Sequence, residues 1–96
     1  MELSIFVRLQ GRPGEGPAIA AAIRAVVAAT RTEPGCRFIE GYRATRGADL
    51  YHIHSRWADE AAFETHAGLV HTVRFLETVG PLVDPPVEVS RAWPLA

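Results

Sequence analysis

Two histidines in the second half of the chain, His66 and His71, are the residues best suited to proton transfer. They are five positions apart in a segment whose pattern predicts a helix. An imidazole changes charge near neutral pH, so it can take a proton from a substrate and release it again. Trp57 and Phe63 precede them and supply aromatic surface for a planar ligand. We therefore expect His66 or His71 to act as a base beside a pocket walled by Trp57 and Phe63.

Each of these residues also has an ordinary structural interpretation. Trp57 can be a core aromatic that packs a helix against a sheet. His66 and His71 can be surface or helix-capping residues. The sequence alone leaves both interpretations open.

A second pair, His52 and His54, has the spacing that places both imidazoles on one face of a strand. Such a pair can begin a metal site. We find no acid or cysteine at a spacing that would complete the ligand set, so we expect no metal there. Strand alternation places this pair on the face opposite to Trp57, where we expect it to fill a subunit interface.

Hydrophobic alternation predicts the strands that position these residues. It covers residues 3–10, 36–43 and 50–57, and a last strand is expected over residues 87–93. Each of the first three alternates between two sets of side chains, as expected for a sheet with two different faces.

Helical periodicity predicts two helices between these strands. The first begins at Pro17, which suits a first helical position, and ends before Pro34. The second follows Asp59, a good N-cap, and runs to Val79 with a break or kink at Gly68. The order is βαββαβ, so we predict an α+β, ferredoxin-like fold with an antiparallel sheet.

Such a sheet carries both helices on one face, yet the other face also bears large side chains. The hydrophobic content is 48% in 96 residues, which exceeds what one thin core readily absorbs. Two sheets packed face to face would cover the bare side. We therefore predict a homodimer.

Composition narrows the function classes further. The length of 96 residues predicts one domain over residues 1–96. A net charge of −1 argues against binding to nucleic acid or to an anionic membrane. The single Cys36 allows no internal disulfide, and we find neither a membrane span nor a signal peptide. We expect a cytoplasmic protein.

Several short motifs, in this order, resemble the antibiotic biosynthesis monooxygenase family of dimeric α+β barrel proteins. They are Glu33-Pro34-Gly35-Cys36, Trp57, Asp59, Ala62-Phe63, His66 and His71. The resemblance implies a homodimer whose two sheets form a barrel, with a pocket between sheet and helices in each protomer. Its better-described members oxidise quinols or polyketide aromatics with O₂ and no bound cofactor, and the family's helical arginine corresponds to Arg74.

The chain departs from the family pattern at three positions. Ser55 replaces a glutamate, Ile53 replaces an asparagine, and Phe63 replaces a tyrosine. No Asn occurs anywhere in the chain, although the haem-degrading branch uses one. These departures leave the reaction open.

We therefore expect a cofactor-independent monooxygenase that oxidises a small electron-rich aromatic with O₂. The alternatives are a non-catalytic small-molecule binding dimer and a haem- or metal-binding member of the same fold. The expected catalytic residues are His66, His71, Trp57 and Arg74, and the expected substrate-binding residues are Ser55, Phe63, Ile53, Tyr51 and Phe38.

Overall fold

The computed structural model describes all residues, from Met1 to Ala96, and contains one four-stranded antiparallel sheet. The strands are β1 (Leu3–Gln10), β2 (Cys36–Arg43), β3 (Leu50–Trp57) and β4 (Glu88–Ala92). Their spatial order is β2-β3-β1-β4. The predicted bounds of the first three strands are confirmed, whereas the last strand is one residue shorter at each end.

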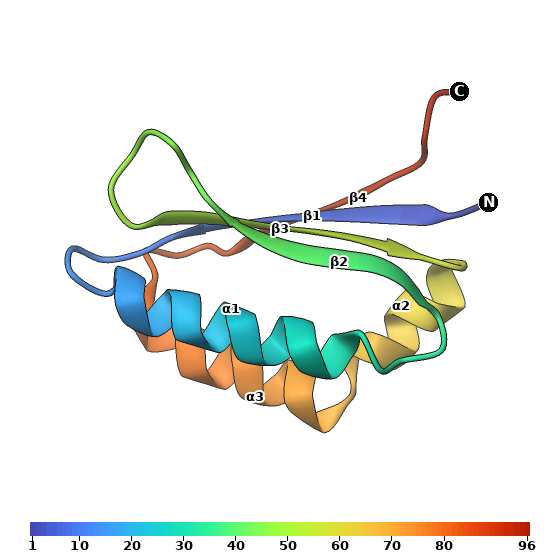
Figure 1. Ribbon diagram of the computed structural model, residues 1–96, viewed down its shortest axis with the longest axis horizontal. Helices are drawn as coiled ribbons and strands as arrows, with labels where there is room; N and C mark the ends of the chain where they lie inside the picture. Colours follow the sequence, from blue (N-terminus) through green and yellow to red (C-terminus); the bar gives the residue numbers. More distant parts are fainter.

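Three α-helices all lie on the same face of this sheet (Figure 1). They are α1 (Gly16–Thr30), α2 (Glu60–Ala67) and α3 (Val70–Val79), and a short 3₁₀ turn, η1, covers Gly80–Leu82. Helices α1 and α3 run side by side, and α2 lies at the end of the sheet where β3 finishes (Figure 1). The predicted ferredoxin-like α+β fold is therefore confirmed.

Local chemistry explains where the second helical segment begins and breaks. Asp59 has an extended backbone, and its Oδ1 accepts from the backbone N–H of Ala62 at 2.9 Å, which caps α2. Gly68 closes α2, and Leu69 is extended before α3 begins. The predicted break at Gly68 is confirmed, and it turns the chain between His66 and His71.

The core lies between the sheet and the helices in two clusters. The larger one joins α1 and α3 to the middle of the sheet and comprises Leu9, Ile19, Ile23, Val26, Val27, Ile39, Tyr51, Ile53, Phe75, Val79 and Val83. The smaller one consists of Leu3, Ile5 and Trp57. Since Leu3 pairs with Trp57 and Ile5 with Ser55, the smaller cluster packs where β3 meets α2.

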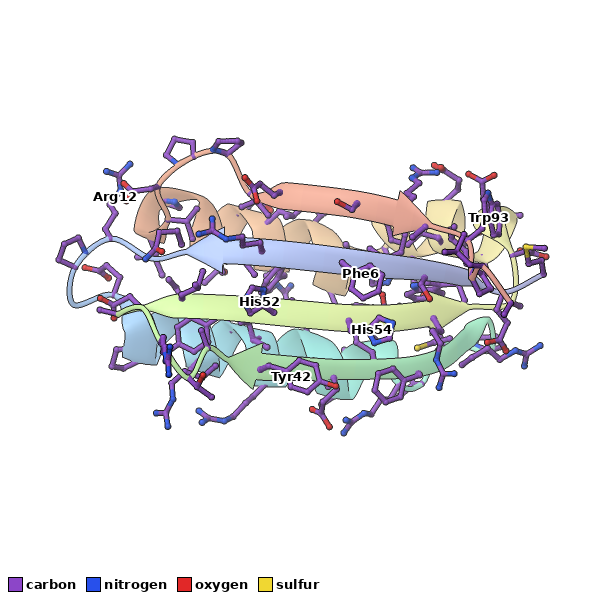
Figure 2. The ribbon with its side chains drawn as sticks, turned by 90° about the horizontal axis from the view of Figure 1, so that it is seen from above. Phe6, Arg12, Tyr42, His52, His54 and Trp93 are labelled. Carbon is purple, nitrogen blue, oxygen red and sulfur yellow. The ribbon has the colours of Figure 1, made fainter.

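The opposite face of the sheet carries no helix (Figure 2). Phe6 and His54 stack there with ring centroids 4.6 Å apart, and Tyr42 and His52 share this face (Figure 2). Burial lowers the pKa of His54 below its ordinary value of 6.5, and the positive charge of Arg56 lowers it further. The predicted separation of His52 and His54 from Trp57 is confirmed. None of the helices is both long and apolar enough to cross a lipid bilayer.

Candidate active site

A buried carboxylate holds the two helical histidines together. Glu33 Oε2 lies 2.7 Å from His66 Nδ1 and 2.7 Å from His71 Nε2. The exposed fractions of the three side chains are 9% for Glu33, 11% for His66 and 27% for His71. Contacts this short between imidazole N–H groups and a carboxylate are typical of charge-assisted hydrogen bonds.

The break at Gly68 lets both histidines reach the same oxygen. In one continuous helix, side chains five positions apart would point about 140° away from each other. Here His66 lies in the last turn of α2 and His71 in the first turn of α3, and the backbone N–H of Leu69 donates to the carbonyl of His66 at 3.1 Å. The turn between the two short helices directs both imidazoles toward Glu33.

The turn that carries Glu33 is fastened to the start of α2. The Glu33 carbonyl accepts from Cys36 N–H at 3.1 Å, and the Gly35 carbonyl accepts from Ala58 N–H at 2.9 Å. A Cβ placed on Gly35 would lie 2.5 Å from the Ala62 Cβ, closer than real Cβ contacts allow. Glycine at this position therefore permits the close approach that brings Glu33 to His66.

A cavity of about 140 Å³ lies beside His66, between the sheet and the helices. Its wall is mostly aliphatic and aromatic, with a few hydroxyl groups. The lining residues are Ile5, Val7, Val26, Thr30, Ile39, Ile53, Ser55, Phe63, His66, Ala67, Thr72, Phe75, Leu76, Val87 and Val89. An apolar hollow with few polar groups is the usual form of a small-molecule site.

The hydroxyl groups in this wall are buried and not fully used by the protein. Trp57 Nε1–H donates to Ser55 Oγ at 2.9 Å, so the Ser55 proton remains free to donate elsewhere. Thr30 Oγ1 is completely buried and has no hydrogen-bond partner. Thr72 Oγ1 lies 3.3 Å from His66 Nδ1. The cavity therefore offers polar groups that a ligand can satisfy.

His66 has the arrangement of a general base oriented by an acid. Its Nδ1 faces the Glu33 carboxylate, which accepts only, so the ring proton resides on Nδ1. Its Nε2 then carries the lone pair and has no hydrogen bond to the protein. A carboxylate that fixes the tautomer and orientation of a histidine is the arrangement used in many hydrolytic sites.

Four of the residues predicted for the site line this cavity together: His66, Ser55, Phe63 and Ile53. Trp57 does not line it. It is completely buried behind Ser55 and His66, with its ring centroid 4.5 Å from that of His66 and 5.8 Å from that of Phe63. Trp57 therefore supports the site instead of forming the wall that we expected.

His71 lies on the far side of Glu33 from the cavity. It borders a groove between α1 and α3 that is lined mostly by alanines. Arg74 is exposed and borders the same groove, so it does not face His66. We expected Arg74 among the catalytic residues, but it does not lie at this cavity, because α3 turns Arg74 toward α1.

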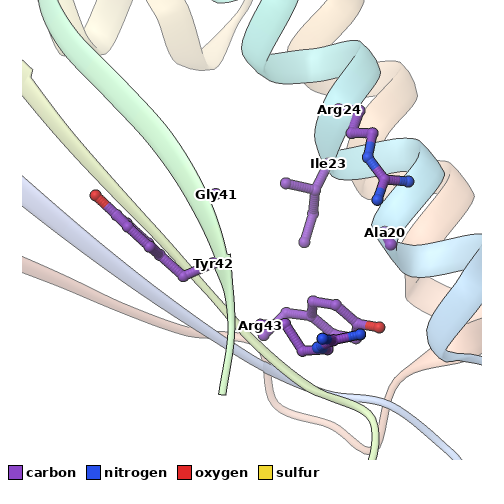
Figure 3. Close-up of a pocket in the computed structure, with 7 residues that line it drawn as sticks. Ala20, Ile23, Arg24, Gly41, Tyr42 and Arg43 are labelled. Atoms are coloured by element: carbon purple, nitrogen blue, oxygen red, sulfur yellow. The ribbon is translucent and has the colours of Figure 1, made fainter. Parts of the chain in front are cut away.

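Two further residues were expected at the pocket and lie elsewhere. Phe38 is on the helix-free face, where its ring centroid is 5.3 Å from that of His54 and the Arg56 guanidinium lies over it at 4.9 Å. Tyr51 shares the helix-covered face but lies near the opposite end of β3. It borders a separate hollow of about 330 Å³ between α1 and β2. Figure 3 shows Ile23 and Arg24 of α1 facing that hollow, with Tyr42 pointing away from it.

Glu33 is the site residue that sequence reasoning missed. It belongs to the Glu-Pro-Gly-Cys motif that carried the family resemblance, but no role was assigned to it. It is 33 positions from His66 in the sequence, so helix or strand periodicity cannot predict their contact. An acid placed directly after a helix and before a predicted buried strand is the signal that could have pointed to it.

An ion-pair group lies beside Phe63, one of the residues that line the cavity. Arg91 of β4 lies 2.6 Å from Glu64 and 3.2 Å from Glu60, both on α2. Its guanidinium also lies 5.0 Å from the ring centroid of Phe63. The hydrogen bond to Glu64 raises the pKa of Arg91. These contacts tie the edge strand to the helix above the cavity.

Glu33, His66 and His71 are also residue types that bind divalent metals, and their ligand atoms lie within 4.8 Å of one another. The 2.7 Å distances from Glu33 Oε2 suit two bridging protons. A cation at this point would have to replace both protons, with His66 Nδ1, His71 Nε2 and the Glu33 carboxylate as ligands.

Comparison with known proteins identifies the family. A sequence model described as "Antibiotic biosynthesis monooxygenase" matches residues 3–78. The Mycobacterium tuberculosis protein named "Putative monooxygenase Rv0793" is 30% identical over 93 residues, which cover 97% of this chain and 91% of that protein. The solved structure of Rv0793 superposes with a TM-score of 0.93 over 100% of this chain and 97% of that chain, at 28% identity.

A second solved structure, PA3566 from Pseudomonas aeruginosa, has a TM-score of 0.91 at 27% identity, covering 99% of this chain and 95% of that chain. The sequence match spans the segments that contain Glu33, Trp57, His66 and His71. The chain therefore belongs to the antibiotic biosynthesis monooxygenase family.

Proposed function

We propose that the protein is a monooxygenase that oxidises a small electron-rich phenol or hydroquinone with O₂ and needs no bound cofactor. The observation that carries this proposal is that His66 is oriented by Glu33 and also lines an apolar cavity. The family of the chain supports the reaction class.

The chemistry begins with removal of a proton from the substrate hydroxyl by His66 Nε2. The resulting phenolate gives an electron to O₂ far more readily than the neutral phenol does. Glu33 stabilises the imidazolium that forms, and the apolar wall keeps water from the anion. His66 and Glu33 therefore supply the base, while the cavity supplies the dry surroundings.

The oxygen transfer balances without a further reductant. The phenoxyl radical and superoxide combine to form a C–O bond at a ring carbon that bears hydrogen. The resulting peroxide anion takes back the proton held by His66, which yields a hydroperoxide and restores the base. Loss of water from this intermediate leaves a carbonyl at that carbon. One atom of O₂ thus enters the product, and the other leaves as water.

Ser55, and not Arg74, is the anion-stabilising donor in this proposal. Its oxygen accepts from Trp57 Nε1–H at 2.9 Å, so its own proton is available to a phenolate in the cavity. A donor that is already oriented in a water-poor site stabilises developing negative charge effectively. Trp57 acts through Ser55 and His66 and is a positioning residue.

Oxygen uptake with a panel of hydroquinones and phenols tests this proposal. The purified protein should consume O₂ with at least one of them, and metal analysis of the same preparation should find less than stoichiometric metal. His66→Gln should abolish the uptake. No uptake with any compound, or equal uptake by wild type and His66→Gln, would contradict the proposal.

A binding protein without catalysis is the second candidate. The substitutions at Ser55, Ile53 and Phe63 favour it, because these positions line the cavity and differ from the pattern of the better-described members of the family. Thermal stabilisation by a phenol without any O₂ uptake would select this candidate. A stoichiometric transition metal, removable by a chelator together with activity, would instead select a metal enzyme built on Glu33, His66 and His71.

We also propose that the helix-free face forms a homodimer. Phe6 is 49% exposed and Tyr42 46%. On this face Phe6 stacks on His54, and Tyr42 is the strand partner of His52 (Figure 2). A monomer rarely leaves an aromatic patch of this kind open to water. A second copy of the chain, packed sheet to sheet, would cover it.

A further inference from the structure

We infer that the ligand of the His66 cavity is a single-ring phenol or hydroquinone bearing an uncharged alkyl or alkenyl side chain. The ring of the ligand lies inside the cavity, and its side chain lies in the cavity mouth. This inference rests on the proposed function for the identity of the ring hydroxyl. The size of the cavity and the distribution of its polar groups carry it.

The volume of the cavity limits the number of rings. It encloses about 140 Å³, and an apolar cavity of about 150 Å³ in another protein holds one benzene molecule. A six-membered ring therefore fills the hollow. Three fused rings of an anthrone would require the sheet and α3 to separate.

The polar groups are confined to the buried part of the wall. Thr30, Ser55, His66 and Thr72 are each at most 9% exposed. Of these, the Thr30 hydroxyl has no partner in the protein, and a buried hydroxyl without a partner costs about 1–3 kcal/mol. A ring with two oxygen substituents can bind His66 and Ser55 with one of them and satisfy Thr30 with the other.

The mouth of the cavity is apolar and open. Leu76 of α3 is 49% exposed and Val89 of β4 is 53% exposed, and both line the cavity. Val73, one turn before Leu76 on α3, is also exposed. A substituent that leaves the ring here would cover aliphatic side chains that are otherwise in water.

The charges near the mouth favour an uncharged side chain. Arg91 follows the lining residue Val89 by two positions on β4, and it is already paired with both Glu60 and Glu64. Two carboxylates against one guanidinium leave a net negative charge. A carboxylate at the end of the side chain would meet these two carboxylates and a guanidinium that is already paired, so it would be repelled, whereas an alkyl or alkenyl chain would not.

Binding without oxygen provides the test, because it separates recognition from turnover. Trp57 lies against His66, so a ligand in the cavity changes its fluorescence. Trp93→Phe removes the other tryptophan and leaves Trp57 as the reporter. The ligands are hydroquinone and its 2-methyl, 2-propyl, 2-pentyl and 2-heptyl derivatives, titrated anaerobically.

We expect Kd to fall by about two- to fourfold for each added methylene until the mouth is covered, and then to level off. Leu76→Ser should flatten this dependence. Val70→Ser, on the same helix but outside the cavity lining, is the matched control and should leave the slope unchanged. Thr30→Val should reduce the preference for hydroquinones over the corresponding phenols by about tenfold.

Three results would overturn the inference: no binding, a Kd independent of chain length, or an equal loss of slope in Val70→Ser and Leu76→Ser. Tighter binding of an anthrone than of any single-ring compound would do the same. The proposed function has a separate readout. If Kd depends on chain length but no O₂ is consumed, the inference is supported and the monooxygenase proposal is contradicted. If O₂ is consumed but Kd does not depend on chain length, the monooxygenase proposal is supported and the inference is contradicted.

Discussion

The chain carries two pairs of histidines within 20 residues of sequence, and the fold gives them opposite surroundings. His66 and His71 share the carboxylate of Glu33 on the helix-covered side of the sheet. His52 and His54 lie on the helix-free side, where His54 stacks on Phe6 and its Nε2 is buried without a partner. The same side chain is therefore a candidate base in one pair and a packing element in the other.

The difference lies in the neighbours and not in the spacing. An acid that accepts from Nδ1 leaves the other nitrogen of His66 free beside an apolar cavity. No carboxylate bonds to His52 or His54, and burial together with the charge of Arg56 lowers the pKa of His54. A histidine motif therefore indicates chemistry only when the structure supplies both an acid partner and a place for a substrate.

The largest expected effect is a difference in activity between variants of the two histidine pairs. His66→Gln should lower kcat for O₂ uptake by about 10²- to 10⁴-fold, because that is the usual contribution of a general base. His54→Gln, on the opposite face, should change kcat by less than about twofold, as expected for a side chain remote from the chemistry. Comparable losses in both variants would remove the distinction drawn between the pairs.

The helix-free face can be tested by assembly. Phe6→Glu should raise the dissociation constant of the proposed dimer by at least about 100-fold, because it places two carboxylates in an apolar interface. Val70→Glu introduces the same charge on α3 and serves as the control. Sedimentation equilibrium distinguishes the species. A wild-type chain that remains monomeric at high concentration would contradict the proposed dimer itself.

The role of Glu33 as the shared partner of His66 and His71 can be tested by stability. Glu33→Ala should lower the free energy of unfolding by about 2–3 kcal/mol, because two partly buried imidazole N–H groups lose a charged acceptor. Glu88→Ala breaks an exposed pair with Arg8 at 3.9 Å and should cost less than about 0.5 kcal/mol. Urea denaturation measures both. Similar small losses would show that Glu33 does not hold the histidines.

The smallest effect concerns His54 and pH. Because burial and Arg56 lower the pKa of His54, the folded chain binds this proton less readily than the unfolded chain does. Its neutral form therefore contributes stability above the unfolded pKa of about 6.5, and this contribution is lost as the pH falls below that value.

His54→Phe keeps the stack on Phe6 and removes the titrating group. Its Tm should fall less than that of wild type between about pH 7.5 and about pH 5. His52→Phe is the control, because it removes an imidazole on the same face that does not stack on Phe6. It shows whether the effect is specific to His54. Identical pH slopes in wild type and His54→Phe would refute the assignment.

The sequence predicted the fold closely because its signals are local. Alternation located β1, β2 and β3 at their observed bounds, and Gly68 marked the break between α2 and α3. Strand parity also separated His52 and His54 from Trp57, because side chains two positions apart share a face. These inferences need only neighbouring residues.

The parts of the site that depend on distant contacts or irregular backbone could not be predicted. Glu33 contacts His66 from 33 positions away in the sequence, and it lies in a turn that has neither helical nor strand periodicity. The register of β2 shifts between Cys36 and Phe38, so that Cys36 packs against the helix-side core while Phe38 stacks near His54 on the other face.

Tyr51 and Arg74 were misplaced for geometric reasons. Tyr51 points to the helix-covered face of β3, as expected. However, it precedes Ser55 by four residues, which corresponds to about 13 Å along the strand, so one small cavity cannot include both. Arg74 follows His71 by three positions on α3 and borders the groove with α1 instead of the cavity. A family correspondence gave its position in the sequence but not its direction.

A crystal structure with a bound 2-alkylhydroquinone, prepared without oxygen, tests the central claim most directly. We predict that the ring lies in the cavity, with one hydroxyl oxygen within hydrogen-bond distance of His66 Nε2. The alkyl chain should lie against Leu76 and Val89. A ligand bound instead in the hollow between α1 and β2, or on the helix-free face beside His54, would contradict it.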